Sequence, residues 1–378
     1  MAEENKTVAI RINGHPVDAI EGTTILDVAK KMGIYIPALC HHPKITPSGA
    51  CRVCLVEVNG LPITSCTTVV ENDMEIITDS PYIESLRRDI IDLLLSDHPY
   101  DCMVCQKTGE CELQELAYKY EIRSPFFKGE RRIYAKRDGN PFIERDMEKC
   151  ILCGRCVRVC AEVQGVGAID FAYKGFGTKV CPPFERDLDC EFCGQCVMVC
   201  PTGALVGKQW LGKGRYWGMR ETDTVCPYCG VGCNITLHVK DNEIVRVTSR
   251  ENSVPNKGLL CVKGRFGYEF VSAPDRLKTP LIRIETKDEG RRTKDEKQEG
   301  ISRPSSLVPH LSSLFREASW DEALDYTAKK LKEIKETYGP DSMAGLSSAR
   351  CTTEENYLFQ KFVRAAIGTN NVDHCARL

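Results

Sequence analysis

The residues whose chemistry is most evident in this chain are its cysteines. Of 378 residues, 22 are cysteine, and nineteen of these fall into four closely spaced groups. One group has a histidine where a fourth thiolate would stand. Thiolate is the preferred ligand of iron–sulfur clusters, and a cluster needs four ligands that converge on one small volume. Because cysteines close in sequence converge easily, the spacing predicts a series of iron–sulfur sites.

The first group has gaps of ten, two and eleven residues between its cysteines, which are Cys40, Cys51, Cys54 and Cys66. The first gap is longer than the four-residue gap of plant-type ferredoxins. Turn signals at Asn13-Gly14 and Asn59-Gly60 predict two hairpins, and Thr24 can cap a helix between them. Two hairpins around one helix predict a β-grasp 2Fe-2S domain over residues 1–78. Zinc, which usually binds two short pairs of ligands, is the alternative.

The second group predicts a 4Fe-4S site over residues 79–125, with the ligands His98, Cys102, Cys105 and Cys111. A helix that begins at Ser80-Pro81 leads into it. A lone histidine is more often structural, but this one precedes a cysteine group that has only three thiolates. Neutral imidazole in place of thiolate makes a cluster less negative and should raise its potential. His41 and His42 lie beside Cys40, where four cysteines already suffice, so we interpret both as structural.

The third segment, residues 140–210, contains two runs with the Cys-x2-Cys-x2-Cys-x3-Cys spacing. In two-cluster ferredoxins the fourth cysteine of each run binds the cluster of the other run. We therefore expect two 4Fe-4S clusters and an exchange of Cys160 and Cys200 between the runs. Cys181 is not needed by this count. The two expected ligand sets are Cys150, Cys153, Cys156 with Cys200, and Cys190, Cys193, Cys196 with Cys160.

The fourth segment, residues 222–280, has gaps of two, three and 27 residues between its cysteines, Cys226, Cys229, Cys233 and Cys261. The long gap holds two alternating stretches, Ile235–Val239 and Ile244–Thr248, which predict strands. This is not a ferredoxin spacing. A 4Fe-4S cluster is the expectation, and a zinc site is the alternative.

These groups resemble domains of known redox families. The first two resemble the front domains of the large peripheral subunit of complex I and of iron-only hydrogenases. The fourth resembles the N-terminal 4Fe-4S domain of molybdenum or tungsten bis-pterin (molybdopterin guanine dinucleotide, bis-MGD) oxidoreductases. In that family a lysine soon after the last cysteine lies between cluster and pterin. Lys263, in Cys-Val-Lys-Gly-Arg, has this place, so the resemblance implies that it binds the pterin cofactor and assists electron transfer.

The last segment, residues 281–378, predicts an incomplete α/β domain. Residues 286–314 are polar, and we expect an exposed loop there. A helix with a capping box of Ser319 and Glu322, a strand at 343–347 and a helix that begins at Thr352 follow. One strand with two helices cannot bury both of its faces.

The final stretch, from Gly368 to Leu378, resembles formate dehydrogenase catalytic subunits just before their metal-binding cysteine or selenocysteine. Selenocysteine is encoded by UGA, which is ordinarily a stop codon. The resemblance implies that the chain is the front portion of a selenocysteine-type formate dehydrogenase, with the metal ligand expected just after Leu378. A fragment that ends here by chance is the alternative. Cys351 and Cys375 are not assigned as ligands, and we expect the 378-residue chain alone to be inactive.

The same resemblance implies a function. A full-length protein would oxidise formate to CO2, or run the reverse, at molybdenum or tungsten held by bis-MGD. Electrons would pass from the Cys226–Cys261 cluster through the two ferredoxin-like clusters and the His98 cluster to the 2Fe-2S cluster. The acceptor would be a flavin subunit that reduces NAD(P)+, or a ferredoxin- or hydrogenase-linked partner.

Two other families remain open. The first is a non-catalytic electron-transfer subunit of the complex I type, which shares the first three segments. The second is an iron-only hydrogenase, but the Cys226–Cys261 spacing does not resemble its catalytic motifs.

Composition limits the remaining classes. The net charge of −2 and a pI near 6.4 give no reason to expect a nucleic-acid partner. The sequence has no signal-peptide core and no apolar run long enough to span a membrane. Many cysteines without a secretory signal indicate metal binding rather than disulfides. We therefore expect a cytoplasmic, multidomain α+β protein.

Overall fold

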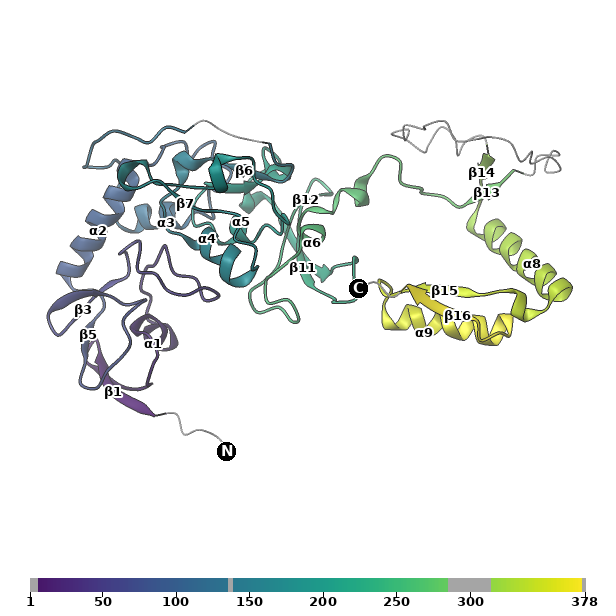
Figure 1. Cartoon of the computed structure of the whole chain (residues 1–378), viewed down its shortest axis with the longest axis horizontal. Coiled ribbons are helices and arrows are strands. Elements are labelled where there is room, and N and C mark those ends of the chain that lie inside the picture. Colours follow the sequence, from purple (N-terminus) through teal and green to yellow (C-terminus); the bar gives the residue numbers. More distant parts are fainter. Residues whose placement is uncertain (1–5, 135–138, 285–313, 376–378) are drawn as a thin grey trace. The chain divides into compact units, whose positions relative to one another are not determined.

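The computed structural model describes residues 6–134, 139–284 and 314–375 (Figure 1). The chain forms two compact units. The first comprises Met1–Thr224 and Cys233–Tyr268, and the second comprises Val225–Gly232 and Glu269–Leu378. Apart from residue 314, the loop expected at 286–314 lies outside the described residues.

A five-stranded sheet with the order β2-β1-β5-β3-β4 forms the N-terminal part of the first unit. β1 pairs antiparallel with β2 and parallel with β5, which the sequence did not predict. Helix α1 is capped by Thr24, whose hydroxyl accepts a hydrogen bond from the Asp27 amide. Both predicted hairpins and the helix are confirmed. The elements are β1 (Thr7–Ile12), β2 (His15–Ile20), α1 (Ile25–Lys31), β3 (Leu55–Val58), β4 (Leu61–Thr64) and β5 (Glu75–Ile77).

The second cysteine group lies between two helices. Helix α2 (Pro81–Ser96) starts at the expected cap, Ser80, whose hydroxyl accepts from the Ile83 amide. It ends two residues before His98, and Cys111 is the N-cap of α3 (Glu112–Lys119). Leu95, Leu113 and Leu116 pack in one buried core with cysteines from the first and third segments, which are Cys40, Cys51 and Cys153. The first three segments therefore share a hydrophobic core.

The ferredoxin-like segment is built from two matching halves. In each half a left-handed glycine, Gly154 (φ 70°) or Gly194 (φ 71°), precedes a short helix that carries the third cysteine of its run. The residues two positions earlier, Leu152 and Phe192, also have positive φ. The elements are β6 (Ile143–Arg145), η1 (Met147–Lys149), α4 (Arg155–Arg158), η2 (Val159–Val163), β7 (Asp170–Ala172), η3 (Gly175–Gly177), β8 (Lys179–Cys181), η4 (Pro183–Glu185), α5 (Gln195–Val199), β9 (Leu205–Gly207), η5 (Lys208–Trp210) and η6 (Tyr216–Gly218).

A three-stranded sheet, β10-β11-β12, follows the ferredoxin-like segment. Its two antiparallel strands β11 and β12 occupy the stretches predicted as strands. The elements of this part are β10 (Arg220–Val225), β11 (Asn234–Lys240), β12 (Glu243–Thr248), α6 (Val262–Phe266) and η7 (Glu269–Ser272).

Within residues 269–284 and 314–375, the second unit contains the sheets β13-β14 and β15-β16 and the α-helices α8 and α9. Ser319 caps α8 as expected, but the Glu322 carboxylate pairs with Arg316 instead of completing a capping box. The complete box forms at Thr352 and Glu355 of α9. The predicted strand β15 pairs in parallel with β16, which the sequence did not predict. The elements are β13 (Leu281–Arg283), β14 (Phe315–Glu317), α8 (Trp320–Tyr338), η8 (Pro340–Ser342), β15 (Gly345–Ser348), α9 (Thr353–Phe362), η9 (Val363–Ile367) and β16 (Val372–Cys375).

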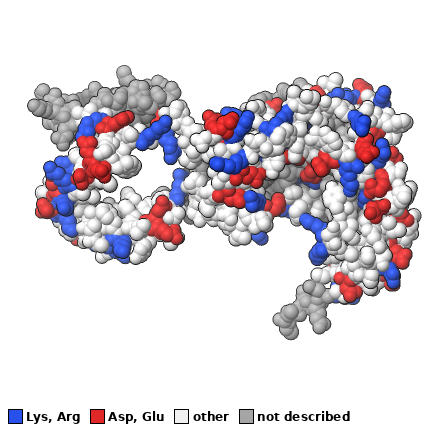
Figure 2. All heavy atoms as spheres, turned by 180° about the vertical axis from the view of Figure 1, so that it is seen from behind, with Lys and Arg blue, Asp and Glu red and all other residues white. Residues whose placement is uncertain are grey.

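The described surface carries charges of both signs. Figure 2 shows basic and acidic side chains interspersed over the visible face, in keeping with the small net charge. Of the helices within residues 6–134, 139–284 and 314–375, none combines the length and apolarity that crossing a bilayer requires.

Candidate iron–sulfur sites

The four cysteines of the first segment share one buried volume. Their exposed fractions lie between 0% and 8%. Cys40 lies within hydrogen-bond reach of Cys51 and Cys66, and these contacts hold its pKa far below the ordinary value. A hydrogen bond from Cys66 likewise lowers the pKa of Cys54 to about 7. The structure therefore brings all four predicted ligands of the 2Fe-2S cluster together, with thiolate favoured at two of them.

The second group gathers around the end of α2. His98, Cys102 and Cys111 line one cavity. Burial raises the pKa of Cys111 to about 11, and the adjacent Cys105 contributes to that increase. The Gly203 backbone lies so close to Cys105 that a Cβ at position 203 would stand 2.6 Å from its sulfur. Cys105, the remaining predicted ligand of the second group, is thus held against the third segment.

His98 has the properties of a metal ligand. It is 9% exposed, and burial lowers its pKa to about 4, so its imidazole is neutral at pH 7. Its Nδ1 atom has no hydrogen-bond partner within the described part of the chain. A buried polar atom without a partner is rare, and a bound metal would satisfy it. The residue therefore fits the site that its spacing predicts.

The two runs of the ferredoxin-like segment line two small pockets. One pocket is lined by Cys150, Cys153, Cys156 and Cys200. The other is lined by Cys160, Cys190, Cys193 and Cys196. Each pocket takes three cysteines from one run and the fourth from the other, which is the grouping that the spacing predicts.

Backbone amides point at three of these sulfurs. The Leu152 and Phe192 amides donate to Cys150 Sγ (3.4 Å) and Cys190 Sγ (3.3 Å), and the Ala168 amide donates to Cys160 Sγ (3.3 Å). The positive φ of Leu152 and Phe192 turns those two amides inward. Hydrogen bonds to cluster sulfurs raise the reduction potential. Both pockets therefore have the chemistry of iron–sulfur sites.

The fourth group is divided between the two units. Cys226 and Cys229 belong to the second unit, whereas Cys233 and Cys261 belong to the first. Cys226 is buried, and Cys229 and Cys261 are exposed. Lys263 is exposed on α6, directly after Cys261. This ligand set and the role of Lys263 stay predictions.

No three His, Cys, Asp or Glu side chains among the described residues surround a point as they would a single metal ion. In a 4Fe-4S cluster each ligand binds a different iron, and in a 2Fe-2S cluster the four ligands are shared between two irons, so that cluster ligands stand further apart than the ligands of one ion.

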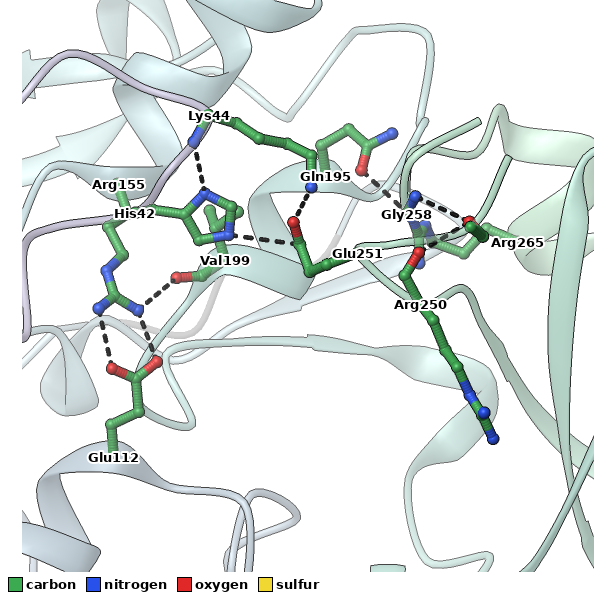
Figure 3. Close-up of polar contacts among 11 residues, drawn as sticks. His42, Lys44, Glu112, Arg155, Gln195, Val199, Arg250, Glu251, Gly258 and Arg265 are labelled. Carbon is green, nitrogen blue, oxygen red and sulfur yellow. Dashed lines mark hydrogen bonds and ion pairs between the residues drawn. The ribbon is translucent and has the colours of Figure 1, made fainter. Parts of the chain in front are cut away.

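His42 is satisfied by neighbours rather than poised as a ligand. Its Nδ1 accepts from the Lys44 amide (3.3 Å), and its Nε2 lies 3.6 Å from the Glu251 carboxylate. Lys44 also pairs with Glu251, as Figure 3 shows. These contacts agree with the structural role expected from the sequence.

Buried cations, which the sequence reasoning missed, join the segments of the first unit. Arg155 is 4% exposed and forms a double hydrogen bond with Glu112, with distances of 2.5 and 2.8 Å (Figure 3). It also donates to the carbonyls of Ala38 (3.0 Å) and Val199 (3.4 Å). One guanidinium thereby connects the first three segments. The signal available in the sequence was a charged residue, Arg155, between the predicted ligands Cys153 and Cys156.

Two further arginines determine which sites are neighbours. Arg158 donates to the carbonyls of Cys40 (2.7 Å) and Cys153 (3.1 Å). Arg132 pairs with Asp97, beside His98, and donates to the Cys150 carbonyl (3.2 Å). The pocket of Cys150 and Cys153 therefore borders both the 2Fe-2S loop and the His98 site. The family resemblance implied a single file in which the His98 cluster passes electrons to the 2Fe-2S cluster, and this order stays a prediction.

Comparison with protein families gives five matches in succession. They are the 2Fe-2S iron–sulfur cluster binding domain (residues 5–81), the NADH-ubiquinone oxidoreductase-G iron–sulfur binding region (87–125), the ferredoxin-like domain of NADH-quinone oxidoreductase subunit 3 (140–206), the molybdopterin oxidoreductase Fe4S4 domain (219–273) and molybdopterin oxidoreductase (276–378). The predicted order of domains is confirmed.

Curated relatives match almost the whole chain. The alpha subunit of an NADPH-Fe(3+) oxidoreductase from Geobacter sulfurreducens is 38% identical over 98% of this chain and 40% of its own length. The G 2 subunit of a Rhizobium meliloti NADH-quinone oxidoreductase is 36% identical, also over 98% of this chain and 40% of its own length. A Bacillus subtilis protein named "Putative formate dehydrogenase YrhE" is 32% identical, with the same coverage. The chain spans about two fifths of the length of these relatives.

A solved structure supports the same layout. A chain of an NAD+-reducing [NiFe]-hydrogenase, in the H2-reduced state, is 28% identical and has a TM-score of 0.51; the match covers 53% of this chain and 87% of that chain. By these comparisons the chain is similar to molybdopterin oxidoreductases in its last two domains and to NADH-quinone oxidoreductase in the domains before them.

Proposed function

We propose that this protein is the iron–sulfur electron-transfer portion of a formate dehydrogenase catalytic subunit. The main support is the gathering of ligand-type side chains into separate buried places along one unit of a molybdopterin oxidoreductase-type chain. The substrate is inferred from the terminal stretch 368–378 and from the Bacillus relative with formate dehydrogenase in its name.

The proposed ligands form five sets. The unpartnered His98 Nδ1 and the amides aimed at Cys150, Cys160 and Cys190 support the choice of side chains. Bound clusters would supply one-electron transfer. The sets are Cys40, Cys51, Cys54 and Cys66 for 2Fe-2S, and for 4Fe-4S His98, Cys102, Cys105 and Cys111; Cys150, Cys153, Cys156 and Cys200; Cys190, Cys193, Cys196 and Cys160; and Cys226, Cys229, Cys233 and Cys261.

The proposal extends to the catalytic end. Lys263 would contact the pterin of a molybdenum or tungsten bis-MGD cofactor. The domain boundaries proposed with these roles are 1–78, 79–125, 140–210, 222–280 and 281–378.

The proposed partner is a flavin subunit that binds NAD(P), or a ferredoxin- or hydrogenase-linked protein. The names of the Geobacter relative and of the hydrogenase structure both include a nicotinamide nucleotide, which supports the first choice. Nineteen cysteines are proposed as cluster ligands rather than disulfide partners, which suits a reducing compartment, so the cytoplasm is the proposed location.

A second candidate is an electron-transfer subunit of the NADH-quinone oxidoreductase type, without formate chemistry. The 36% identity of the Rhizobium relative favours it, as do the family matches over residues 87–125 and 140–206.

Metal analysis of the full-length protein, purified without oxygen, tests both candidates. The five cluster sites predict about 18 irons per chain, whereas far fewer would reject the ligand sets. Molybdenum or tungsten together with formate-dependent dye reduction supports the formate dehydrogenase proposal. Full iron content without either metal, and without formate activity, would favour the NADH-quinone oxidoreductase candidate.

A further inference from the structure

Arg265 is a buried cation that none of the roles above uses. It lies in α6, two residues after Lys263, and its exposed fraction is 0%. Burial lowers its pKa to about 10, so that it remains charged at pH 7. A buried guanidinium is unfavourable unless an anion and hydrogen-bond acceptors compensate for its lost hydration.

The hydrogen bonds of Arg265 go to the cysteine loop of the ferredoxin-like segment. Nε donates to the Cys193 carbonyl (2.9 Å), and Nη2 donates to the Gln195 side-chain oxygen (3.2 Å). Gln195 in turn donates to the carbonyl of Leu260 (3.0 Å), the residue before Cys261. Figure 3 shows Gln195 and Arg265 facing each other in this arrangement.

Gly194 makes room for this guanidinium. A Cβ at position 194 would stand 2.2 Å from Arg265 Cδ and 2.8 Å from its Nε. The side chain therefore lies flat against the loop that joins Cys193 to Cys196. This close approach needs glycine, quite apart from the positive φ of the same residue.

The charge of Arg265 lacks a carboxylate partner. Within the described residues it forms no ion pair with Asp or Glu, and its Nη1 atom has no hydrogen-bond partner. Cys193, Cys196 and Cys261 favour its charged form, whereas burial and the nearby cation Arg246 oppose it. Arg155, on α4 beside the other pocket, is different because Glu112 neutralises it.

We propose that Arg265 is the counter-charge of the 4Fe-4S cluster at Cys160, Cys190, Cys193 and Cys196 and raises its reduction potential. A cluster with four thiolate ligands is anionic and becomes more so when it gains an electron. A fixed cation in a dry environment therefore favours the reduced form. The inference rests on the cluster assignment proposed above and adds a residue that sets the reduction potential of one of the two pockets.

Redox titration followed by EPR spectroscopy tests the inference on the anaerobically purified holoprotein. Cys190→Ser identifies the signal of this cluster by its loss. Arg265→Gln removes the charge, Arg265→Lys keeps it, and Arg250→Gln removes an exposed arginine of the same segment. We expect a lower midpoint potential for this cluster in Arg265→Gln alone, while Arg265→Lys and Arg250→Gln stay near the wild type.

An unchanged potential in Arg265→Gln, at full iron content, would overturn the inference. If Arg265→Gln instead fails to assemble this cluster, retention in Arg265→Lys supports a need for charge, and loss in both variants rejects it. The iron content of the wild-type protein separately tests the cluster assignment, so the two failures are distinguishable.

Discussion

Gly203 lies directly against Cys105 at the His98 site, and the Lys149 side chain lies beside Gly203. The Lys149 ammonium is 2.8 Å from Asp101 and 3.1 Å from Asp146. Burial acts to lower its pKa, but these hydrogen bonds outweigh burial and raise it. The thiol of Cys105 is thus enclosed by a glycine backbone and a permanent cation. At this site, residues that are not proposed as iron ligands therefore limit the space around Cys105.

Gly203→Ala should selectively disturb the His98 site. The added methyl group would stand 2.6 Å from Cys105 Sγ, and overpacking of this kind costs about 1–3 kcal/mol. We expect about four irons to be lost per chain, together with the EPR signal of one 4Fe-4S cluster. Gly218→Ala is the matched control because no atom lies within 4 Å of its added Cβ. Equal iron content in the two variants would contradict the prediction.

At the scale of elements, the first unit is held together by buried cations between its segments. Arg155 contacts Glu112 at the start of α3, and Arg246 on β12 forms a double hydrogen bond with Glu110 (2.6 and 2.7 Å). Both carboxylates flank Cys111, a proposed ligand. The loops that hold the cysteines are therefore positioned by ion pairs to other elements as much as by their own short helices.

Glu112→Ala should destabilise the first unit by about 1–3 kcal/mol, because it leaves the buried Arg155 charge without its half-exposed partner. The double variant Glu112→Ala with Arg155→Met should recover part of this loss. Thermal unfolding of the two variants and of Arg155→Met alone gives the coupling. Strict additivity of the two single effects would show that the pair is not coupled.

The β10-β11-β12 sheet should lose stability in acid through His238. Burial lowers the pKa of this residue to about 4, against about 6.5 in an unfolded chain. Between these values the unfolded state binds more protons, so stability is full above pH 6.5 and declines as pH falls towards 4. Between pH 7 and 5 the loss should be about 1–2 kcal/mol.

Melting temperatures at pH 7 and pH 5 measure this loss. The decrease should be smaller in His238→Gln, which can retain a hydrogen bond to Thr248 but does not titrate. An identical decrease in the wild type and the variant would refute the role of His238.

At the scale of the whole molecule, the neighbours of the proposed sites determine which routes electrons can take. The contacts of Arg158 and Arg132 place the 2Fe-2S loop and the His98 site beside the same ferredoxin-like pocket. For the proposed clusters we therefore expect a branched arrangement in the first unit, with this pocket at the branch point. In such an arrangement the 2Fe-2S site does not depend on the His98 site for electrons.

Removal of the His98 cluster tests the branch. In His98→Ala, the 2Fe-2S cluster should still be reduced at near the wild-type rate when electrons enter at the molybdopterin end. Freeze-quench EPR spectroscopy of the full-length enzyme measures this rate. A 2Fe-2S cluster that stays oxidised in His98→Ala would instead support a single file of clusters. Cys153→Ser should block reduction of the 2Fe-2S cluster in both the branched and the single-file arrangement.

The sequence alone predicted the ligand types, the order of the domains and the local elements near them. Cysteine spacing, the caps at Thr24, Ser80 and Thr352 and the hairpin turns all act between residues that are close in the chain. Side-chain chemistry and local backbone preference are therefore enough to predict these features.

Only the tertiary structure decided which loops are neighbours. Arg155 reaches Ala38 across 117 residues, and Arg265 reaches Cys193 across 72. Strands β5 and β16 pair with strands distant in sequence and are too short to show a pattern of their own. Such contacts depend on how separate segments pack around a common core, and a buried arginine looks in sequence like any surface charge. For that reason, only the packing in the structure pointed to the proposed counter-charge Arg265 and to the expected branch at the pocket of Cys150 and Cys153.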